Sequence, residues 1–451
     1  MKILFTAHQF FPDHRAGVEI VTLGLARELK DRGHEPYVLA AKRSIPDGEI
    51  RPGETQDYWF EGIPVRRVGR PEEGLSRPYG LNYRNDDMAR SAREYLQETE
   101  PDVVHAMHLQ GLSAAVIPVL KELGLPVVYT AADFWTICPV VDLRRHDGLL
   151  CTGPDVSHCV RCIASRNPDP RLRNAANTVP GAVLRVADGL SHTPLSRFSH
   201  SLRQLGAVRE RLAYIGESME LVDRILTYTR LTRDLLVSNG LGVGKTEVSH
   251  YGIDTSRFTE ASVKRHRSSA LRLGFVGTLV PHKGCDLLVR AFKMLPPELG
   301  TTLSIHGEVG RYGSFVEELR GLAGDDERIT FYGAFPQKEV GRVLSEIDVL
   351  VVPSRWYENA PGVIFEAFAA GAPVVATDLG GMSEFVRHGE DGLLFGLDDA
   401  TDLARQLRRL AGEPGLLEKL RGGIGPVKTV GEYTDELEEL YGTLLASNRM
   451  R

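Results

Sequence analysis

The sequence lacks the features that mark membrane-spanning, secreted and nucleic-acid-binding proteins. None of its apolar runs approaches the roughly 18 residues that a membrane-spanning helix needs. The apolar start, residues 1–7, is far too short for a signal peptide. There is no basic excess, since the net charge is −6, which argues against a nucleic-acid partner. We therefore expect a cytoplasmic protein. Local basic clusters such as 161–173 leave a peripheral contact with an anionic membrane surface open.

Cysteine is also scarce, with 5 in 451 residues, but four of the five are close together in the sequence: Cys138, Cys151, Cys159 and Cys162. Disulfides are not expected in a cytoplasmic protein, and four neighbouring thiols suit a tetrahedral zinc site. Only Cys159 and Cys162 have the close Cys-x2-Cys spacing of zinc ribbons. Three interpretations follow: a structural zinc site, reduced thiols, or a disulfide. A zinc ion here would have a structural role, holding the segment 138–177 together, and would not take part in catalysis.

What is present is a repeated alternation of short β-rich runs with amphipathic stretches, the pattern of parallel βαβ units. Apolar residues make up 42% of the chain, enough for sizeable cores. The expected strands are 2–7, 36–41, 102–108, 126–131, 189–193 and 247–251 in the first half, and 271–277, 302–307, 329–333, 348–354, 373–378 and 392–395 in the second. Two such sets predict an α/β protein with two Rossmann-like, doubly wound parallel-sheet domains.

The domain junction is expected near residues 252–265, where the sequence becomes polar and charged. This gives a first domain over 1–252, a second over 253–430 and a last amphipathic helix over 431–451. The segment 138–177, with its cysteines, prolines and charges, interrupts the first domain. Residues 196–239 are expected to form two helices.

The window 356–366, Trp-Tyr-Glu-Asn-Ala-Pro-Gly-Val-Ile-Phe-Glu, suggests a phosphate site. It follows an expected strand and opens a helix at about Pro361, a favourable first-turn residue. The helix N-terminus then lies at the carboxyl end of a parallel strand, where open α/β sheets bind ligands and where phosphates are stabilised. Carboxylates at Glu358 and Glu366 could accept hydrogen bonds from ribose or sugar hydroxyls. The alternative is that both are ordinary acids favoured by the helix dipole.

A second element is Gly-Thr-Leu-Val-Pro-His-Lys-Gly, residues 277–284. It places Lys283 after an expected strand and just before a helix. A lysine there could neutralise a diphosphate leaving group. The alternative is a solvated loop lysine.

Together these segments resemble glycosyltransferase family 4, the large retaining family with the GT-B fold. The likeness continues through residues 366–377, Gly380-Gly381-Met382-Ser383-Glu384 and residues 389–395. It is weaker in the first half. The resemblance implies two domains that face a central cleft, with an acceptor-binding first domain and a donor-binding second one. It also implies that the last helix packs back on the first domain.

By this resemblance, Lys283 holds the donor diphosphate, Glu366 the nucleotide ribose, and Glu358 lies near the transferred sugar. Backbone amides around Gly362 and Val363 complete the phosphate site. The residues expected to bind the donor are Gly17, Gly277, Thr278, Lys283, Gly307, Glu358, Asn359, Gly362, Val363 and Glu366. His108 falls where relatives line the acceptor cleft, with a strand-capping histidine as the alternative. The residues expected to act in catalysis are Glu358, Lys283, Asp133 and His108.

The sequence departs from the family pattern at two positions. Thr278 stands where relatives carry arginine, which leaves Lys283 as the main cation for the diphosphate. Ala132 stands where relatives often carry a histidine that positions the donor sugar. Our hypothesis is that Asp133 or His108 covers part of that role.

The resemblance implies transfer of a sugar, with retention, from a nucleoside diphosphate sugar, with uridine or guanosine the expected bases. The acceptor would be a growing glycan of polysaccharide biosynthesis, a lipid-linked saccharide or a small molecule. No catalytic metal is expected. Two rival functions share the architecture: a sugar-nucleotide epimerase, which needs no acceptor, and a non-catalytic sugar-nucleotide-binding protein.

Overall fold

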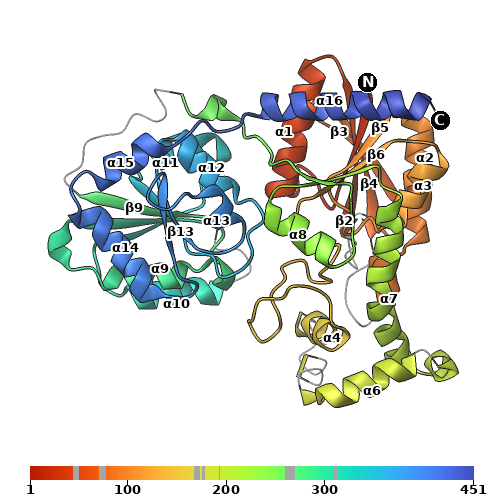
Figure 1. The fold of residues 1–451 in the computed structure, drawn as a ribbon, viewed down its shortest axis with the longest axis horizontal. Helices are drawn as coiled ribbons and strands as arrows, with labels where there is room; N and C mark the ends of the chain where they lie inside the picture. The colour runs from red at the N-terminus through yellow and green to blue at the C-terminus, as the bar shows by residue number, and fades with distance from the viewer. Residues whose placement is uncertain are drawn as a thin grey trace. The chain divides into compact units, whose positions relative to one another are not determined.

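The computed structural model describes residues 1–43, 50–70, 78–166, 173–174, 178–191, 193–259, 270–308 and 313–450. The chain forms two compact units (Figure 1). Unit 1 comprises Met1–His250 together with Gly431–Arg451, and unit 2 comprises Tyr251–Val430. The predicted junction at 252–265 begins beside this division, and its residues 260–269 lie outside the described residues.

Unit 1 is built on an eight-stranded sheet in the order β3-β4-β2-β1-β5-β6-β7-β8. Its strands are β1 (Lys2–Ala7), β2 (Glu35–Arg43), β3 (Thr55–Phe60), β4 (Ile63–Arg70), β5 (Val103–Ala106), β6 (Val127–Ala131), β7 (Arg224–Thr227) and β8 (Thr246–Val248). All neighbouring pairs are parallel except β3 with β4. The central strand β1 pairs Leu4 with Tyr37 of β2 and with Val104 of β5.

The helices of unit 1 are α1 (Gly17–Asp31), α2 (Asp86–Thr99), α3 (Val116–Glu122), α4 (Val156–Ser165), α6 (Gly181–Ser191), α7 (His200–Glu220), α8 (Arg230–Ser238) and α16 (Val430–Arg449), with 3-10 turns η1 (Tyr79–Asn82) and η2 (Pro194–Phe198). None of the helices in the described residues combines the length and hydrophobicity that crossing a bilayer requires.

The terminal helix α16 is anchored to unit 1 by buried polar contacts. Tyr441 is fully buried, and its hydroxyl lies 2.5 Å from Nδ1 of His105 on β5. The other ring nitrogen of His105 lies 2.6 Å from the hydroxyl of Thr130 on β6. At the surface, Arg32 reaches Glu438 of the helix at 2.5 Å. A helix at the end of the chain therefore completes the core of unit 1.

Unit 2 is a six-stranded, wholly parallel sheet in the order β11-β10-β9-β12-β13-β14. Its strands are β9 (Leu271–Val276), β10 (Thr301–His306), β11 (Ile329–Gly333), β12 (Val349–Val352), β13 (Val374–Thr377) and β14 (Gly392–Phe395). Its helices are α9 (Cys285–Lys293), α10 (Gly313–Ala323), α11 (Val340–Ser345), α12 (Gly362–Ala369), α13 (Gly381–Phe385), α14 (Ala400–Gly412) and α15 (Leu416–Gly423), with 3-10 turns η3 (Thr255–Arg257), η4 (Pro281–Lys283), η5 (Pro297–Leu299) and η6 (Gln337–Glu339).

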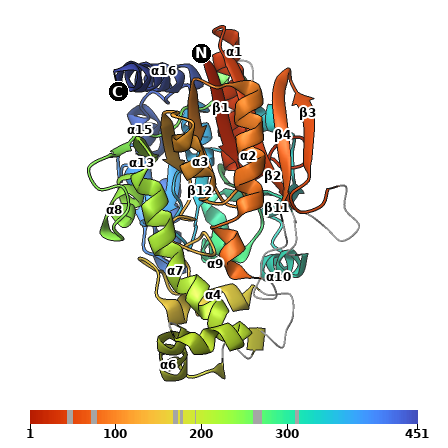
Figure 2. The same cartoon turned by 90° about the vertical axis from the view of Figure 1, so that its right-hand side faces the viewer.

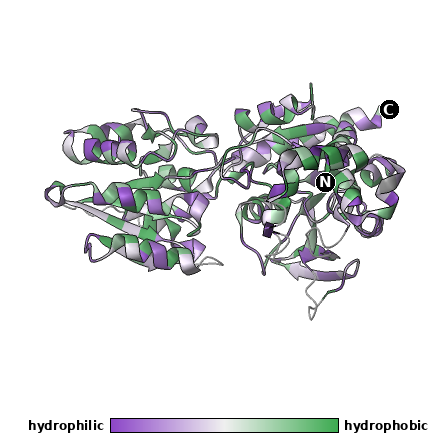
Figure 3. Cartoon of the chain, turned by 90° about the horizontal axis from the view of Figure 1, so that it is seen from below, coloured by the Kyte–Doolittle hydropathy of each residue, from purple (hydrophilic) through white to green (hydrophobic). Residues whose placement is uncertain are grey.

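The central strand β12 shows why this sheet is covered on both faces. Successive side chains of a strand point to opposite faces. Val349 and Val351 belong to a buried cluster with α9, α10 and α14, whereas Leu350 and Val352 belong to a second cluster with α11 and α12. A strand that is apolar at every position therefore fits a sheet between two helical layers. Figure 3 shows the same distribution, with green hydrophobic residues in the strands and purple hydrophilic ones on outer helical surfaces.

Several sequence predictions of elements are wrong or incomplete. Of the expected strand 189–193, residues 189–191 belong instead to the helix α6 (Gly181–Ser191), and residue 192 lies outside the described residues. The strand at that place in the sheet is β7 (Arg224–Thr227), within the stretch predicted to be helical only. Four residues are too few to interrupt a helical pattern visibly. The β3–β4 pair was also missed.

The segment 138–177 contains α4, followed by residues 167–172 and 175–177, which lie outside the described residues. Figures 1 and 2 both place α4 and α6 at the end of unit 1 away from β3 and α16, with α7 leading back toward the sheet. The cysteine-containing segment is therefore an excursion from the sheet, not part of it.

Candidate functional site

In unit 2, the loop after β12 leads into the N-terminus of α12. Pro361 is the N-cap residue, in extended conformation, and no side chain caps the helix. The first N–H groups of a helix lack intrahelical partners and attract anions. The predicted opening of a helix at Pro361 is thus confirmed, and Gly362 and Val363 are its first two residues.

Glu358 in this loop is held by three donors that converge on one carboxylate oxygen. Its Oε1 accepts hydrogen bonds from Lys283 Nζ at 2.6 Å, Ser354 Oγ at 2.7 Å and Trp356 Nε1 at 2.8 Å. Among the described residues, no hydrogen bond reaches its other oxygen, Oε2. One oxygen therefore fixes the side chain, and the other remains available to a ligand.

The charge state of Glu358 follows from this environment. Burial alone would raise the pKa of its carboxyl. The charge of Lys283 and the hydrogen bonds from Lys283, Ser354 and Trp356 outweigh burial and lower the pKa below its ordinary value. Glu358 is therefore an ionised, buried carboxylate at neutral pH. The Lys283 side chain is 29% exposed, so part of its ammonium group can still meet a bound molecule.

Lys283 is positioned by a tight turn between β9 and α9. Gly284 has φ +72°, and a Cβ there would lie 1.9 Å from the carbonyl oxygen of Pro353, so the turn packs directly against the end of β12. Arg355 strengthens the connection, because its N–H bonds to the carbonyl of His282 and its guanidinium bonds to Asp286 of α9 at 2.6 Å. The two predicted motifs are thus joined through backbone as well as through Lys283 and Glu358.

Four more residues of unit 2 were predicted to bind the donor: Gly277, Thr278, Gly307 and Asn359. Gly277 and Gly307 end neighbouring strands, and a Cβ on Gly307 would lie 2.1 Å from the carbonyl oxygen of Gly277. Thr278, at the family's arginine position, is exposed. Asn359 is buried, and a Cβ on Gly381 would lie 1.9 Å from its carbonyl oxygen, so Gly381 supports the loop from behind.

Glu366 lies one turn into α12 and is separate from the Lys283–Glu358 pair. Its Oε1 accepts a hydrogen bond from Nε2 of Gln337 at 2.7 Å. Burial raises the pKa of Glu366 to about 7, although Gln337 and the charge of Arg257 act in the opposite direction. Near neutral pH this carboxyl can therefore exchange its proton, and a hydroxyl donor would favour the ionised form.

In unit 1, the structure brings His108 and Asp133 together. Nε2 of His108 bonds to Oδ2 of Asp133, while the other oxygen of Asp133 accepts the N–H of Trp135 at 2.9 Å. The ring of His108 also contacts that of His8, with centroids 4.5 Å apart, and His8 lies 3.4 Å from Glu19. The network therefore contains four titratable groups, of which the sequence had indicated two as site residues.

This network is largely withdrawn from water. Burial, with smaller effects of neighbouring cations, lowers the pKa of His8 well below its ordinary value, and burial raises the pKa of Glu19. Nδ1 of His8 and Oε1 of Glu19 are buried and make no hydrogen bond in the described residues. Glu19 also accepts the N–H of Ala16, which fixes the start of α1 beside Gly17.

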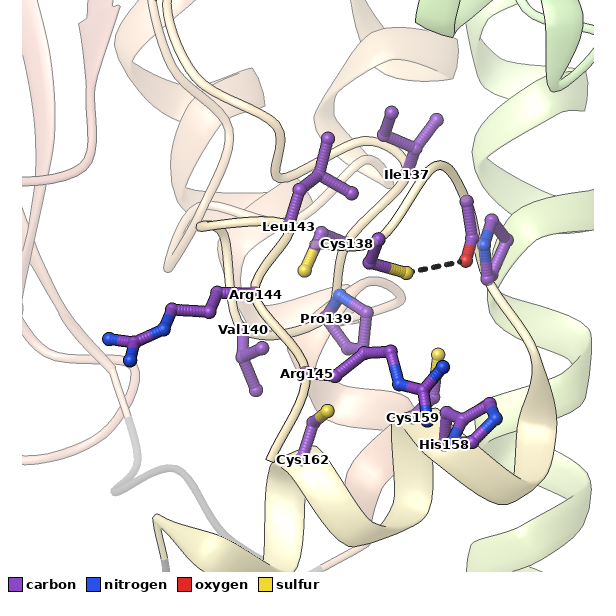
Figure 4. Close-up of a pocket in the computed structure, with 13 residues that line it drawn as sticks. Ile137, Cys138, Pro139, Val140, Leu143, Arg144, Arg145, His158, Cys159 and Cys162 are labelled. Carbon is purple, nitrogen blue, oxygen red and sulfur yellow. Dashed lines mark hydrogen bonds between the residues drawn. The ribbon is translucent and has the colours of Figure 1, made fainter. Parts of the chain in front are cut away.

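The four cysteines Cys138, Cys151, Cys159 and Cys162 line one pocket with His158 (Figure 4). All are free thiols, so the disulfide interpretation does not describe this structure. Burial raises the pKa of Cys159 to about 12 and that of Cys162 to about 11, which favours protonated thiols. Within the described ranges, no three His, Cys, Asp or Glu side chains are arranged so that they could hold a metal ion. The zinc site therefore finds no support here, because zinc needs ligands converging at about 2.3 Å.

Comparison with known proteins places these features in a family. The two-unit architecture matches solved glycosyltransferases of the GT-B fold. The Anabaena HepE protein in complex with UDP and glucose aligns with 98% of this chain and 100% of its own, at TM-score 0.62 and 18% identity. Sucrose-phosphate synthase from Thermosynechococcus elongatus aligns with 99% of each chain, at TM-score 0.66 and 16% identity. The predicted fold class, GT-B, is confirmed.

Two family models match the sequence. The model described as Glycosyl transferases group 1 matches residues 270–413, and Glycosyltransferase Family 4 matches residues 15–150. The chain belongs to this glycosyltransferase family, as its motifs predicted.

Individual relatives are more distant. A D-inositol 3-phosphate glycosyltransferase from Actinosynnema mirum is 33% identical over 250 residues, which are 51% of this chain. The match spans only 60% of that relative's length. A glycogen synthase from Mycobacterium tuberculosis is 27% identical over 429 residues, which are 93% of this chain and 88% of that protein.

Proposed function

We propose that this chain is a retaining glycosyltransferase that moves a sugar from a nucleoside diphosphate sugar, with UDP or GDP as carrier, to a glycan, lipid-linked saccharide or small-molecule acceptor. The observation that carries the proposal is the Lys283–Glu358 ion pair beside the uncapped N-terminus of α12. These groups supply a cation, a hydrogen-bond acceptor and helix N–H groups within one loop system.

The diphosphate is assigned to Lys283 and the start of α12. An ammonium group has three N–H donors, and Lys283 gives one to Glu358. The others can meet phosphate oxygens, and the N–H groups at Gly362 and Val363 can do the same. Negative charge develops on the diphosphate as the sugar leaves, so a fixed cation and helix terminus stabilise the transition state. Thr278, in place of the family's arginine, makes Lys283 the main cation of this site.

Glu358 and Glu366 are assigned different hydroxyl groups of the donor. Oε2 of Glu358 is the free acceptor next to Lys283, which suits a hydroxyl of the transferred sugar. Glu366, farther along α12 and held by Gln337, suits the ribose. A hydroxyl that donates to Glu366 lowers its pKa, so donor binding near neutral pH would release a proton.

The proposal is supported by the molecules that relatives bind or make. HepE was solved with UDP and with UDP-glucose, and the sequence relatives include a glycogen synthase. For this chain, UDP-sugars are therefore the first donors to test. Binding loops vary freely on one scaffold, so we propose only the class of acceptor and not a particular molecule.

In unit 1, we assign His108 and Asp133 to positioning the reacting sugar or acceptor, since Ala132 cannot. The Asp133 carboxylate orients the His108 ring through Nε2, while Nδ1 of His108 accepts the N–H of Gln110 at 2.9 Å. Both ring nitrogens are therefore occupied, so Asp133, whose side chain is 21% exposed, is the group that could contact a hydroxyl.

A thermal-shift screen against UDP-, GDP-, ADP- and TDP-sugars tests the donor site. A bound donor raises the melting temperature by mass action. We expect one nucleotide class to stabilise the wild type, and Lys283→Ala and Glu366→Ala to lose the response. Lys419→Ala and Glu318→Ala change exposed residues of the same unit outside the site and should keep it.

A stabilising response that survives both site substitutions would overturn the assignment. Product analysis then separates the rival functions: transfer requires an acceptor, whereas an epimerase converts the donor alone. A protein that binds the donor but neither transfers nor hydrolyses it would be a non-catalytic binder.

A further inference from the structure

Helix α6 in unit 1 exposes an apolar stripe instead of a polar one. Val183, Val186 and Leu190 are 53%, 66% and 40% exposed, and their spacing places them on one face of the helix. The neighbouring face carries the buried residues Leu184 and Asp188 and packs against α7 and α4. The helix is therefore already seated on unit 1, and the stripe is a second apolar face.

A further exposed apolar residue lies on the turn that follows α6. Phe198, the last residue of η2, is 89% exposed, the highest exposure of any large apolar side chain in the described residues. The turn η2 contacts both α6 and α7, so Phe198 is held close to α6 on an ordered turn. Clusters of exposed apolar side chains on soluble proteins mark interaction sites.

The exposed charged residues of α6, η2 and the start of α7 are arginines. Arg185, Arg197 and Arg203 are exposed, and within the described residues none of them forms an ion pair. The one acid of this stretch, Asp188, is buried and paired with Arg209. The chain as a whole carries a net charge of −6, so this positive patch contrasts with the rest of the protein.

The position of the stripe makes it accessible. Figures 1 and 2 show α6 at the extremity of unit 1, beyond the end of α7 and away from the sheet. A flat partner could thus meet α6 and η2 without meeting the sheet of unit 1.

We propose that α6 and η2 form a docking surface for an anionic lipid bilayer. The apolar side chains Val183, Val186, Leu190 and Phe198 would enter the boundary between headgroups and acyl chains, and the three arginines would lie at the lipid phosphates. A helix with one apolar face and flanking arginines binds in this way.

A second copy of the chain is a poorer partner for the same surface. A twofold contact through α6 would bring the arginines of one copy close to those of the other. Within the described part of α6 and η2, the one acid is Asp188, which is buried and already bound to Arg209. Anionic lipid, in contrast, carries the negative charge that can pair with these arginines.

Co-sedimentation of the full chain with vesicles tests the proposal. We expect binding to phosphatidylcholine vesicles that contain phosphatidylglycerol, and little binding to phosphatidylcholine alone. The Phe198→Ser substitution should weaken binding at least about tenfold, because the variant has no phenyl ring to transfer from water into the bilayer. Arg185→Glu and Arg197→Glu should each weaken it about fivefold or more, and salt should do the same.

Matched controls make the test specific. Val243→Ser alters a side chain that is 66% exposed, as Val186 is, but lies in a different loop of unit 1. Arg290→Glu alters an exposed arginine of unit 2. Neither should change binding, whereas Val186→Ser should. Vesicles are tested without any sugar donor, so the result is independent of the proposed transfer reaction.

Three outcomes would overturn the proposal. One is no sedimentation with the anionic vesicles, and another is equal loss of binding in Val186→Ser and Val243→Ser. In the third, the wild type binds no vesicles but self-associates in a concentration-dependent way, as measured by analytical ultracentrifugation, and Phe198→Ser abolishes this self-association. That result would assign the surface to a second copy of the chain.

Discussion

Nζ of Lys283 lies 2.6 Å from Oε1 of Glu358, and this contact links the loop after β9 to the loop after β12. Ser354 and Trp356 donate to the same oxygen, so the carboxylate is fixed while Oε2 remains available. The ion pair has a consequence for stability and, by the proposed function, one for donor binding, and the two can be measured separately.

Replacing Lys283 by Met should destabilise the protein by about 1–3 kcal/mol, because it leaves Glu358 buried without its cation. The lysine is partly exposed, which keeps the effect below that of a fully buried pair. Unfolding in urea measures the loss. The double variant Lys283→Met with Glu358→Gln should recover part of it, since the amide carries no charge. Additive losses in the double variant would contradict this account.

The raised pKa of Glu366 predicts a pH dependence of stability. Its pKa is about 7 in the folded chain, against an ordinary value of 4.5. Between these values the unfolded chain releases the proton and the folded chain keeps it, so stability falls as pH rises from about 4.5 to about 7 and is level above.

The Glu366→Gln variant should lack this decline. Relative to that variant, the wild type should lose about 1–2 kcal/mol across the range, a value discounted for partial exposure of the side chain. Urea unfolding of both proteins at several pH values measures it. Parallel curves for wild type and variant would show that Glu366 titrates normally.

The loop that carries Glu358 and Asn359 should be sensitive to a methyl group placed behind it. A Cβ on Gly381 would lie 1.9 Å from the Asn359 carbonyl oxygen, so Gly381→Ala must displace backbone. We expect a loss of about 2 kcal/mol or more and weaker donor binding. Gly321→Ala in α10 is the control, because nothing lies within 4 Å of its Cβ. It should be neutral or stabilise by about 0.5–1 kcal/mol.

Turnover tests the role of the first unit. If His108 and Asp133 position the reacting groups in place of Ala132, His108→Ala and Asp133→Ala should each lower kcat about tenfold or more while the thermal response to the donor persists. His34→Ala, a histidine that contacts Glu438 of α16, is the comparison. Unchanged turnover in both site variants would remove these residues from the mechanism.

Cys159 and Cys162 should react slowly with thiol reagents in the folded protein. The raised pKa values of Cys159 and Cys162, about 12 and about 11, leave almost no thiolate at pH 8. In the folded protein these two thiols should react slowly with a chromogenic disulfide, and all 5 thiols should react rapidly in denaturant. Zinc released in proportion to protein during that reaction would instead restore the metal-site interpretation.

Local patterns identified most of the second unit. Most of its strands are largely apolar and end at glycine or at turns, which makes them recognisable. The loop with Lys283 and the loop with Glu358 were identified for the same reason, because each joins a strand end to a helix start. The first unit was harder, since β7 lies directly between the helices α7 and α8 in the chain, and α6 exposes the residues that a pattern would bury.

Other features depend on chain segments that are distant in the sequence. Nothing near Glu358 in the sequence indicates that Lys283, 75 positions away, donates to its Oε1. His8 and Glu19 could not be recognised beside His108, because ring contact and burial are set by packing between β1, α1 and β5. Likewise, the four cysteines share a pocket without the convergence that their spacing had suggested for zinc.

Local sequence was enough to predict the fold class, the family and the two loops of the proposed donor site, since period and turn chemistry are local properties of the chain. Tertiary packing alone sets which oxygen of Glu358 is occupied, how burial shifts the pKa of Glu366, and which apolar face of α6 stays in contact with water. These depend on the surroundings of a side chain, and folding supplies those surroundings from remote segments.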